Sequence, residues 1–210
     1  GAKMGGLTPT QAVTDFVHTQ GGKAAKLESG KVDLMGGIFA AASLYTGSFG
    51  STNIWTQTAT VNFGQSFTAR PIALKGFYKY TSNVINLVKN VPAGVTIVKD
   101  QTLDQCAIYI ALAKKTYTID NGNQSTFIDF KNDENIIAYG ELPSGAATEG
   151  DGYVEFNIPL KYKNLTDQPT HIIVVCSSSK YGDYMTGGAG STLYVDDLSL
   201  IYDGTPTIWE

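Results

Sequence analysis

Cysteine, methionine, histidine and charge are all scarce in this chain. Its 210 residues include 2 Cys, 3 Met and 2 His, and only 16% of them are charged. Neither cysteine lies in a Cys-x-x-Cys motif of the kind that zinc sites use, and so little charge excludes a charge-rich coiled coil or a disordered tail. Asp and Glu (19) outnumber Lys and Arg (15). We therefore expect neither nucleic acid nor an anionic membrane surface as a partner.

Long hydrophobic runs are also missing. No apolar stretch approaches the roughly 18 residues that a membrane-spanning helix needs, so the sequence predicts no transmembrane segment. The N-terminus has no basic segment followed by an apolar one, and Gly1 is typical of a scar left by tag removal. We expect that the native N-terminus, with any export signal, is truncated here.

Short alternating segments and turn residues dominate what is present, including 23 Gly and 12 Tyr. Val13–Thr19 alternates and predicts a strand, whereas Gly47–Gly50 is predicted to break the apolar segment before it. Leu103–Ala113 is apolar on both faces, which predicts a central strand covered on both sides. Val84–Val88 and Val95–Val98 are predicted to pair as a hairpin. With no alternation of strands and helices and no linker, residues 1–210 are expected to form one domain. Its predicted class is all-β, a two-sheet antiparallel β-sandwich of jelly-roll type.

The two cysteines each lie within an apolar run, Cys106 before Ala-Ile-Tyr-Ile and Cys176 after Ile-Ile-Val-Val. Two small buried thiols are the favoured interpretation, and a cross-strand disulfide is the alternative.

Four blocks of the sequence carry a resemblance to a known family. They are Phe63-Gly-Gln-Ser-Phe-Thr-Ala-Arg-Pro-Ile-Ala-Leu-Lys-Gly-Phe-Tyr-Lys-Tyr80, Cys106-Ala-Ile-Tyr109, Ser177-Ser-Ser-Lys-Tyr-Gly-Asp183 and Gly190-Ser-Thr-Leu-Tyr-Val-Asp-Asp197. Together they resemble the putative carbohydrate metabolism domain (PCMD) family of surface proteins from Bacteroides-type bacteria. The last strand is also similar to that of jelly-roll carbohydrate-binding modules. The resemblance implies carbohydrate chemistry and export to the outer cell surface through a lipid-modified N-terminus.

The pair Asp196-Asp197 is the candidate metal site. Successive strand residues face opposite sides, so one of these carboxylates points towards apolar surroundings unless a bulge intervenes. A buried carboxylate needs a cation or several hydrogen-bond donors. A structural Ca²⁺ would meet that need, and so would N–H groups of a loop.

A sugar site needs aromatic rings for the apolar face of the sugar and planar polar groups for its hydroxyls. Tyr153–Tyr162 alternates cleanly, and its outward residues offer both kinds. Phe77, between Lys75 and Lys79, offers a second ring, and two further aromatics lie in turn-rich segments. The candidate ligand-binding residues are Trp55, Phe77, Lys79, Tyr153, Glu155, Asn157 and Tyr184.

Catalysis has a weaker basis in the sequence. Glu155 with Asp183 or Asp129 is one conceivable carboxylate pair for glycoside hydrolysis, but 19 acidic residues always offer some pair. No Gly-x-Ser-x-Gly motif accompanies the two histidines. We expect a non-catalytic carbohydrate-binding or cell-surface adhesion module. The alternatives are a glycoside hydrolase with an unlocated carboxylate pair and a structural spacer.

Overall fold

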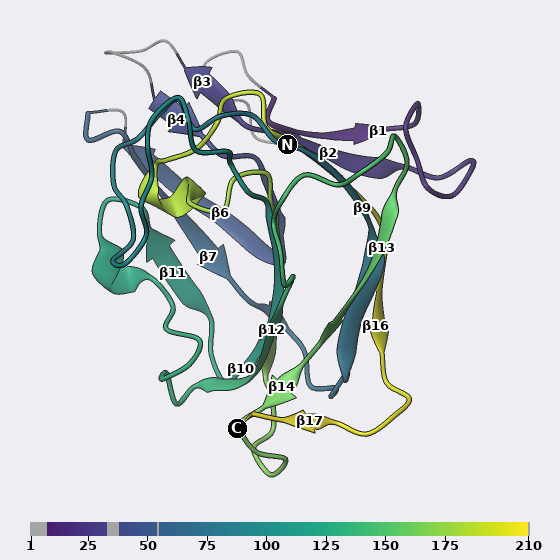
Figure 1. The fold of residues 1–210 in the computed structure, drawn as a ribbon. Helices are drawn as coiled ribbons and strands as arrows, with labels where there is room; N and C mark the ends of the chain where they lie inside the picture. The colour runs from purple at the N-terminus through teal and green to yellow at the C-terminus, as the bar shows by residue number, and fades with distance from the viewer. Residues whose placement is uncertain (1–7, 33–37, 54, 210) are drawn as a thin grey trace.

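A computed structural model describes residues 8–32, 38–53 and 55–209 of the chain, and two large sheets form its centre (Figure 1). The five-stranded sheet has the order β1 (Thr10–Val13), β2 (Ala24–Glu28), β16 (Thr192–Ile201), β9 (Ala73–Thr81), β13 (Val154–Pro159). The seven-stranded sheet has the order β17 (Thr207–Ile208), β14 (Lys161–Tyr162), β12 (Ile136–Glu141), β10 (Ala107–Ala113), β15 (His171–Ser177), β5 (Ser43–Tyr45), with β8 (Gln65–Ser66) also on β15. Pairing is antiparallel except between β14 and β17.

The connections between these sheets give the fold its topology. Along the chain β2, β9, β13 and β16 enter one sheet, while β5, β10, β12 and β15 enter the other. The resulting orders, β2-β16-β9-β13 and β5-β15-β10-β12, are those of an eight-stranded jelly roll. The predicted antiparallel β-sandwich is therefore confirmed.

A smaller layer covers the second face of the seven-stranded sheet. It contains β6 (Gly47–Asn53), β7 (Thr58–Phe63) and β11 (Tyr117–Asp120), and a hairpin of β3 (Gly30–Val32) and β4 (Ile38–Ala40) lies at the same end of the molecule as its β6–β7 turn (Figure 1). Two 3-10 turns, η1 (Gln124–Thr126) and η2 (Gly182–Tyr184), lie in loops. In the described part of the chain no helix is long and apolar enough to cross a membrane.

The main core lies between the two large sheets. Ile108, Ile110 and Leu112 of β10 point into it, while Ala111 and Ala113 point into a second core under the smaller layer. β10 is thus covered on both faces, as the sequence predicts. The predicted hairpin of 84–88 with 95–98 is wrong, because Val84 bridges Leu103 and Leu87 bridges Gly187 instead.

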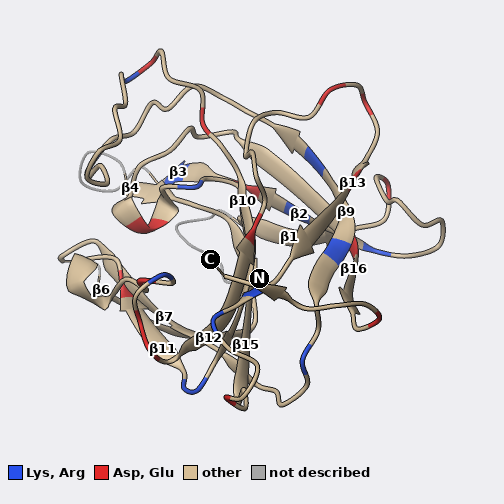
Figure 2. Cartoon of the chain, turned by 60° about the horizontal axis from the view of Figure 1, so that its bottom comes forward, with Lys and Arg blue, Asp and Glu red and all other residues tan. Residues whose placement is uncertain are grey.

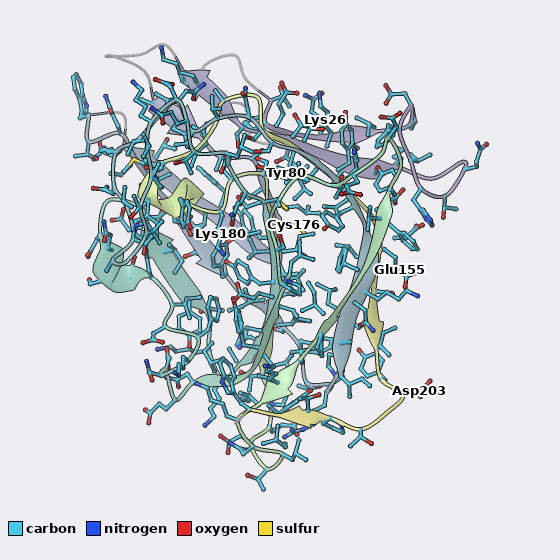
Figure 3. All side chains as sticks on the ribbon, in the orientation of Figure 1. Lys26, Tyr80, Glu155, Cys176, Lys180 and Asp203 are labelled. Carbon is cyan, nitrogen blue, oxygen red and sulfur yellow. The ribbon has the colours of Figure 1, made fainter. Side chains whose placement is uncertain are left out.

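The cysteines are buried as free thiols, which confirms the favoured interpretation. Burial raises the pKa of both Cys106 and Cys176 to about 12. Figure 3 shows Cys176 and Tyr80 between the sheets, whereas Glu155 points away from the interior on β13. Lys and Arg positions are spread over many elements rather than gathered on one (Figure 2).

Candidate functional site

The segment 14–19, between β1 and β2, covers the aromatic rings on the outer face of the five-stranded sheet. The His18 ring stacks on Phe77 with centroids 3.5 Å apart. Phe16 stacks on Tyr153 at 4.9 Å and meets Tyr194 edge-on at 4.8 Å. The Tyr153 hydroxyl donates to the Phe16 carbonyl at 3.0 Å. The two rings predicted to bind sugar are therefore both packed against protein on this face.

Asp196 and Asp197 hold that covering segment in place. A bulge in β16 shifts its register to β9 after Asp196, and Asp197 has a left-handed φ of 50°. Both carboxylates consequently reach residues 18–19. Asp196 Oδ2 accepts from the His18 N–H at 2.8 Å, and Asp197 Oδ2 accepts from Thr19 Oγ1 at 2.5 Å and lies 2.7 Å from His18 Nδ1.

These donors decide the electrostatics of the carboxylate pair. Hydrogen bonds from Thr19 and then His18 hold the pKa of Asp197 below its usual range. Asp196 is 7% exposed, and its Oδ1 accepts from the Asp197 N–H at 2.8 Å. Among the described residues no group of three or more His, Cys, Asp or Glu is arranged to hold a metal ion. Hydrogen-bond donors of residues 18, 19 and 197 thus satisfy the two carboxylates, for which the sequence allows either a calcium ion or N–H groups of a loop. The calcium site stays a prediction.

The three polar candidates on this sheet face differ in how far protein contacts engage them. Lys79 Nζ donates to the Thr148 carbonyl at 3.1 Å and to the Gly150 carbonyl, which ties it to the loop before β13. Glu155 is exposed and forms an ion pair with Lys75 at 3.2 Å. Asn157 is exposed and lies opposite Lys75 in the register. The polar half of the predicted site is accessible, but its aromatic half is covered.

Trp55 differs from the other candidates because its side chain is 79% exposed. It lies in the turn between β6 and β7, where the Asn53 side-chain oxygen accepts from the backbone N–H groups of Trp55 (3.0 Å) and Thr56 (3.2 Å). Gln57 completes the turn with a left-handed φ of 57°, a conformation that is uncommon outside glycine. The sequence thus fixes the backbone of this turn while leaving a large ring in solvent.

A pocket of about 280 Å³ lies directly beside this turn, with Gln57 in its lining. The apolar residues of its lining include Phe39 of β4, Leu87 and Met185. Gly187 allows the close packing beneath, because a Cβ at this position would overlap the Phe39 ring. This volume is just below the roughly 300–1,000 Å³ typical of small-molecule sites.

Two loops form the pocket wall and are tied together by their backbones. Leu87 and Gly187 exchange both backbone hydrogen bonds, at 3.2 and 2.9 Å. Thr186 reinforces the tie, because its hydroxyl accepts from the Lys89 N–H at 3.0 Å and donates to the Asn90 carbonyl at 2.7 Å. The wall is therefore built by residues about 100 positions apart, and it is a preformed part of the fold.

The polar groups of the pocket are amides and lysines. Asn86 and Gln57 supply planar amides, and Lys89 and Lys99 supply ammonium groups. The Asn86 side-chain oxygen accepts from the Ala189 N–H at 3.1 Å, which orients its NH₂ group as the remaining donor. An exposed ring beside planar donors is the combination that recognition of a sugar requires.

Sequence comparison decides the family. The model of the putative carbohydrate metabolism domain matches residues 2–201. The chain belongs to this family. The resemblance proposed from the four sequence blocks is therefore confirmed, and the domain is carbohydrate-related. Among curated proteins no match was found.

Two solved structures that are similar to this PCMD domain come from Bacteroides species. One, a putative glycoside hydrolase from Bacteroides thetaiotaomicron VPI-5482, aligns with a TM-score of 0.68 at 24% identity, over 94% of this chain and 57% of that one. Another, a putative glycoside hydrolase from Bacteroides vulgatus ATCC 8482, has a TM-score of 0.64 at 25% identity, over 92% of this chain and 77% of that one. This domain thus spans little more than half the length of the first relative. A carbohydrate-binding module solved with β-1,4-galactotriose, TmCBM61, aligns with a TM-score of 0.37 at 10% identity, over 93% of this chain and 83% of that one.

The carboxylate pairs considered for hydrolysis lie on different layers of the PCMD domain. Glu155 is on the outer face of the five-stranded sheet, whereas Asp129 belongs to the loop that packs Ile128 and Phe130 on the far face of the seven-stranded sheet. Asp183, in η2, contributes to the raised pKa of Tyr109 on that same far face. The main core therefore separates Glu155 from both of its conceivable partners.

Sequence reasoning missed an aromatic group on the far face of the seven-stranded sheet. Phe130 stacks on Tyr139 with centroids 4.4 Å apart, Tyr139 stacks on Trp209 at 6.0 Å, and Tyr109 meets Phe130 edge-on at 5.3 Å. Burial raises the pKa of Tyr139 above its usual value, with the Glu141 carboxylate adding to the effect. These rings face one another, so we assign them to packing. Tyr184, predicted to bind a ligand, likewise meets Phe127 edge-on at 5.0 Å.

Proposed function

We propose that this domain is a non-catalytic glycan-binding module whose site is the pocket beside the β6–β7 turn. The observation that carries the proposal is the 79% exposed Trp55 in the same turn as Gln57, which lines a pocket together with Asn86 and two lysines. The two candidate rings of the sheet face are engaged: His18 covers one face of Phe77, and Phe16 covers one face of Tyr153. Membership of a carbohydrate-related family supports the ligand class.

Glycoside hydrolysis is the second candidate function, because two structural relatives bear that description. None of the described residues that line the pocket is Asp or Glu, whereas hydrolysis needs two carboxylates about 5–9 Å apart. This lining of amides, lysines and apolar residues favours binding over catalysis at this site.

The setting of the domain is also a proposal. Membership of the family, with its implied export, supports a place on the outer cell surface behind a lipid-modified N-terminus. Such a module would hold a polysaccharide close to its partner domains or serve in adhesion. The spacer alternative differs, because it requires no ligand at all.

The experiment is a glycan-array screen of the purified domain, followed by affinity measurements on the hits. Trp55→Ala is expected to weaken binding by about tenfold or more, a loss of about 1.4 kcal/mol. Tyr202→Ala is the matched control, since Tyr202 is also an exposed aromatic (50%) but lies after β16, away from the pocket.

Three results would contradict parts of the proposal. Full affinity in Trp55→Ala with loss in Tyr153→Ala would move the site to the sheet face. Release of reducing sugar from a bound polysaccharide would favour the hydrolase, and Glu155→Gln would show whether that carboxylate is responsible. A blank array would favour the spacer.

A further inference from the structure

The charges around the pocket are unbalanced. Lys89 and Lys99 both line it, while none of the other lining residues that the structure describes is Asp or Glu, in a chain whose net charge is −4. Lys89 Nζ lies 3.6 Å from Met185 Sδ, which is only a weak acceptor. Within the described part of the chain neither lysine forms an ion pair, although lysines elsewhere do, such as Lys75, Lys26 and Lys114. Among the described residues, two lysines therefore line one small pocket without a carboxylate in the same lining.

Asn86, a neutral residue of the lining, is also biased towards donating hydrogen bonds. Hydrogen bonding to Ala189 engages the Asn86 oxygen and leaves its NH₂ group as a donor. Lysine has three donors and no acceptor. A neutral sugar offers hydroxyls that both donate and accept, whereas this lining is rich in donors and positive charge. The complementary ligand group is an anion, which only accepts hydrogen bonds.

We propose that the pocket recognises an acidic glycan, with the sugar ring against Trp55 and a carboxylate or sulfate substituent between Lys89 and Lys99. The inference rests on the proposed glycan-binding function and names the class of ligand. The shared chemistry is a sugar-borne oxyanion, and it comes either from a uronic acid or from a sulfate ester. A lining that combines apolar residues with Lys89 and Lys99 suits a ligand with an uncharged ring and one charged edge.

The test compares polymers by isothermal titration in low salt. Polygalacturonate is the carboxylate probe, dextran sulfate is the sulfate probe, and methyl-esterified pectin and unmodified dextran are their neutral counterparts. We expect at least one acidic polymer to bind about tenfold more tightly than its neutral counterpart, with an affinity that falls as salt rises. Binding of polygalacturonate alone would identify the carboxylate, and binding of dextran sulfate alone would identify the sulfate.

Variants localise the effect. Lys89→Gln with Lys99→Gln is expected to lower affinity for the acidic polymer about fivefold to tenfold, because exposed charge pairs contribute about 0.2–1 kcal/mol each. Lys131→Gln with Lys161→Gln changes net charge equally at exposed positions outside the pocket lining. An equal loss in both double variants would overturn the inference, because attraction would then come from the whole surface.

Different results would overturn the glycan-binding function and the acidic ligand. Binding to a neutral glycan that Trp55→Ala abolishes and the double variant leaves unchanged would overturn the acidic ligand and keep the glycan-binding site. Absence of binding to every polymer and to the glycan array would overturn both. Binding to acidic polymers that Trp55→Ala leaves intact would overturn the ring contact.

Discussion

Asp104 is the most deeply buried charged side chain in the described part of the chain, at 1% exposure. Its Oδ2 accepts from Ser179 Oγ at 2.5 Å and from the Gly188 N–H at 2.7 Å, and its Oδ1 accepts from the Gln105 N–H at 2.8 Å. The Ser179 hydroxyl also forms a hydrogen bond with the Ser29 hydroxyl, with 2.7 Å between the two oxygens. One carboxylate thus links the start of β10, the end of β15 and the loop that contains Gly188.

Burial raises the pKa of Asp104, and the hydrogen bonds from Ser179 and Gly188 offset part of that shift. The folded chain therefore holds this proton to a higher pH than the unfolded chain, where an aspartate titrates at about 3.9. Its contribution to the free energy of unfolding is full below that pH and is lost as pH rises through the folded-state pKa.

Asp104→Asn tests this prediction. An amide in this place sets an NH₂ group against one of the donors, and we expect a loss of about 1–3 kcal/mol in the free energy of unfolding. The stability difference between wild type and variant should be largest near pH 4 and smaller at pH 7, measured by urea unfolding at each pH. A difference that grows with pH would contradict the raised pKa.

The sequence could predict the candidate residues only in part. The turn-rich surroundings of Trp55 point to an exposed ring, and the structure brings its turn to the pocket through Gln57. Lys89 and Lys99 were not identified, because their segment was interpreted as a hairpin and only the bridge of Leu87 to Gly187 brings it to the pocket. Alternation likewise could not reveal that a bulge turns both Asp196 and Asp197 towards residues 18–19.

At the scale of elements, strands with apolar alternation were predictable and polar strands were not. In β13, Phe156 and Ile158 are buried as predicted, while Val154 at the strand's first position is 40% exposed. β6 was interpreted as a break because Gly47-Ser-Phe-Gly is poor in apolar residues. Every residue of β6 is exposed, and pairing with β7 rather than burial forms the strand.

The segment 14–19 was predicted as part of a strand but instead crosses the sheet face. Asp197→Ala removes the acceptor of Thr19 Oγ1 and the partner of His18 Nδ1. We expect faster amide hydrogen exchange across residues 16–19, with little change in the exchange of β9 and β13. Asp203→Ala is the control, since this exposed aspartate lies in the turn after β16 (Figure 3). Unchanged exchange in Asp197→Ala would show that ring stacking alone holds the segment.

At the scale of the whole molecule, the seven-stranded sheet belongs to two cores at once. Its strand β10 sends Ile110 and Leu112 into the main core and Ala111 and Ala113 into the second. If either the five-stranded sheet or the smaller layer unfolded, one face of the seven-stranded sheet would be exposed. The remaining layer packs against that same sheet, so its own core would be weakened as well. This sharing favours one cooperative unit, as expected for the single domain predicted from the sequence.

Calorimetry tests that cooperativity. We expect a single unfolding transition with a calorimetric enthalpy equal to the van't Hoff enthalpy. Two separated transitions, or a ratio of the two enthalpies well above one, would instead indicate that β6, β7 and β11 unfold independently of the jelly roll.

The position of the binding site is the central claim, and amide chemical shifts in a glycan titration measure it most directly. The labelled domain would be titrated with the tightest-binding glycan of the array. We predict that the perturbed amides gather at Trp55 and Gln57, at Asn86 and Lys89, and around Met185. Perturbations centred instead on Phe77, Tyr153 and Tyr194 would contradict the pocket and restore the sheet face as the site.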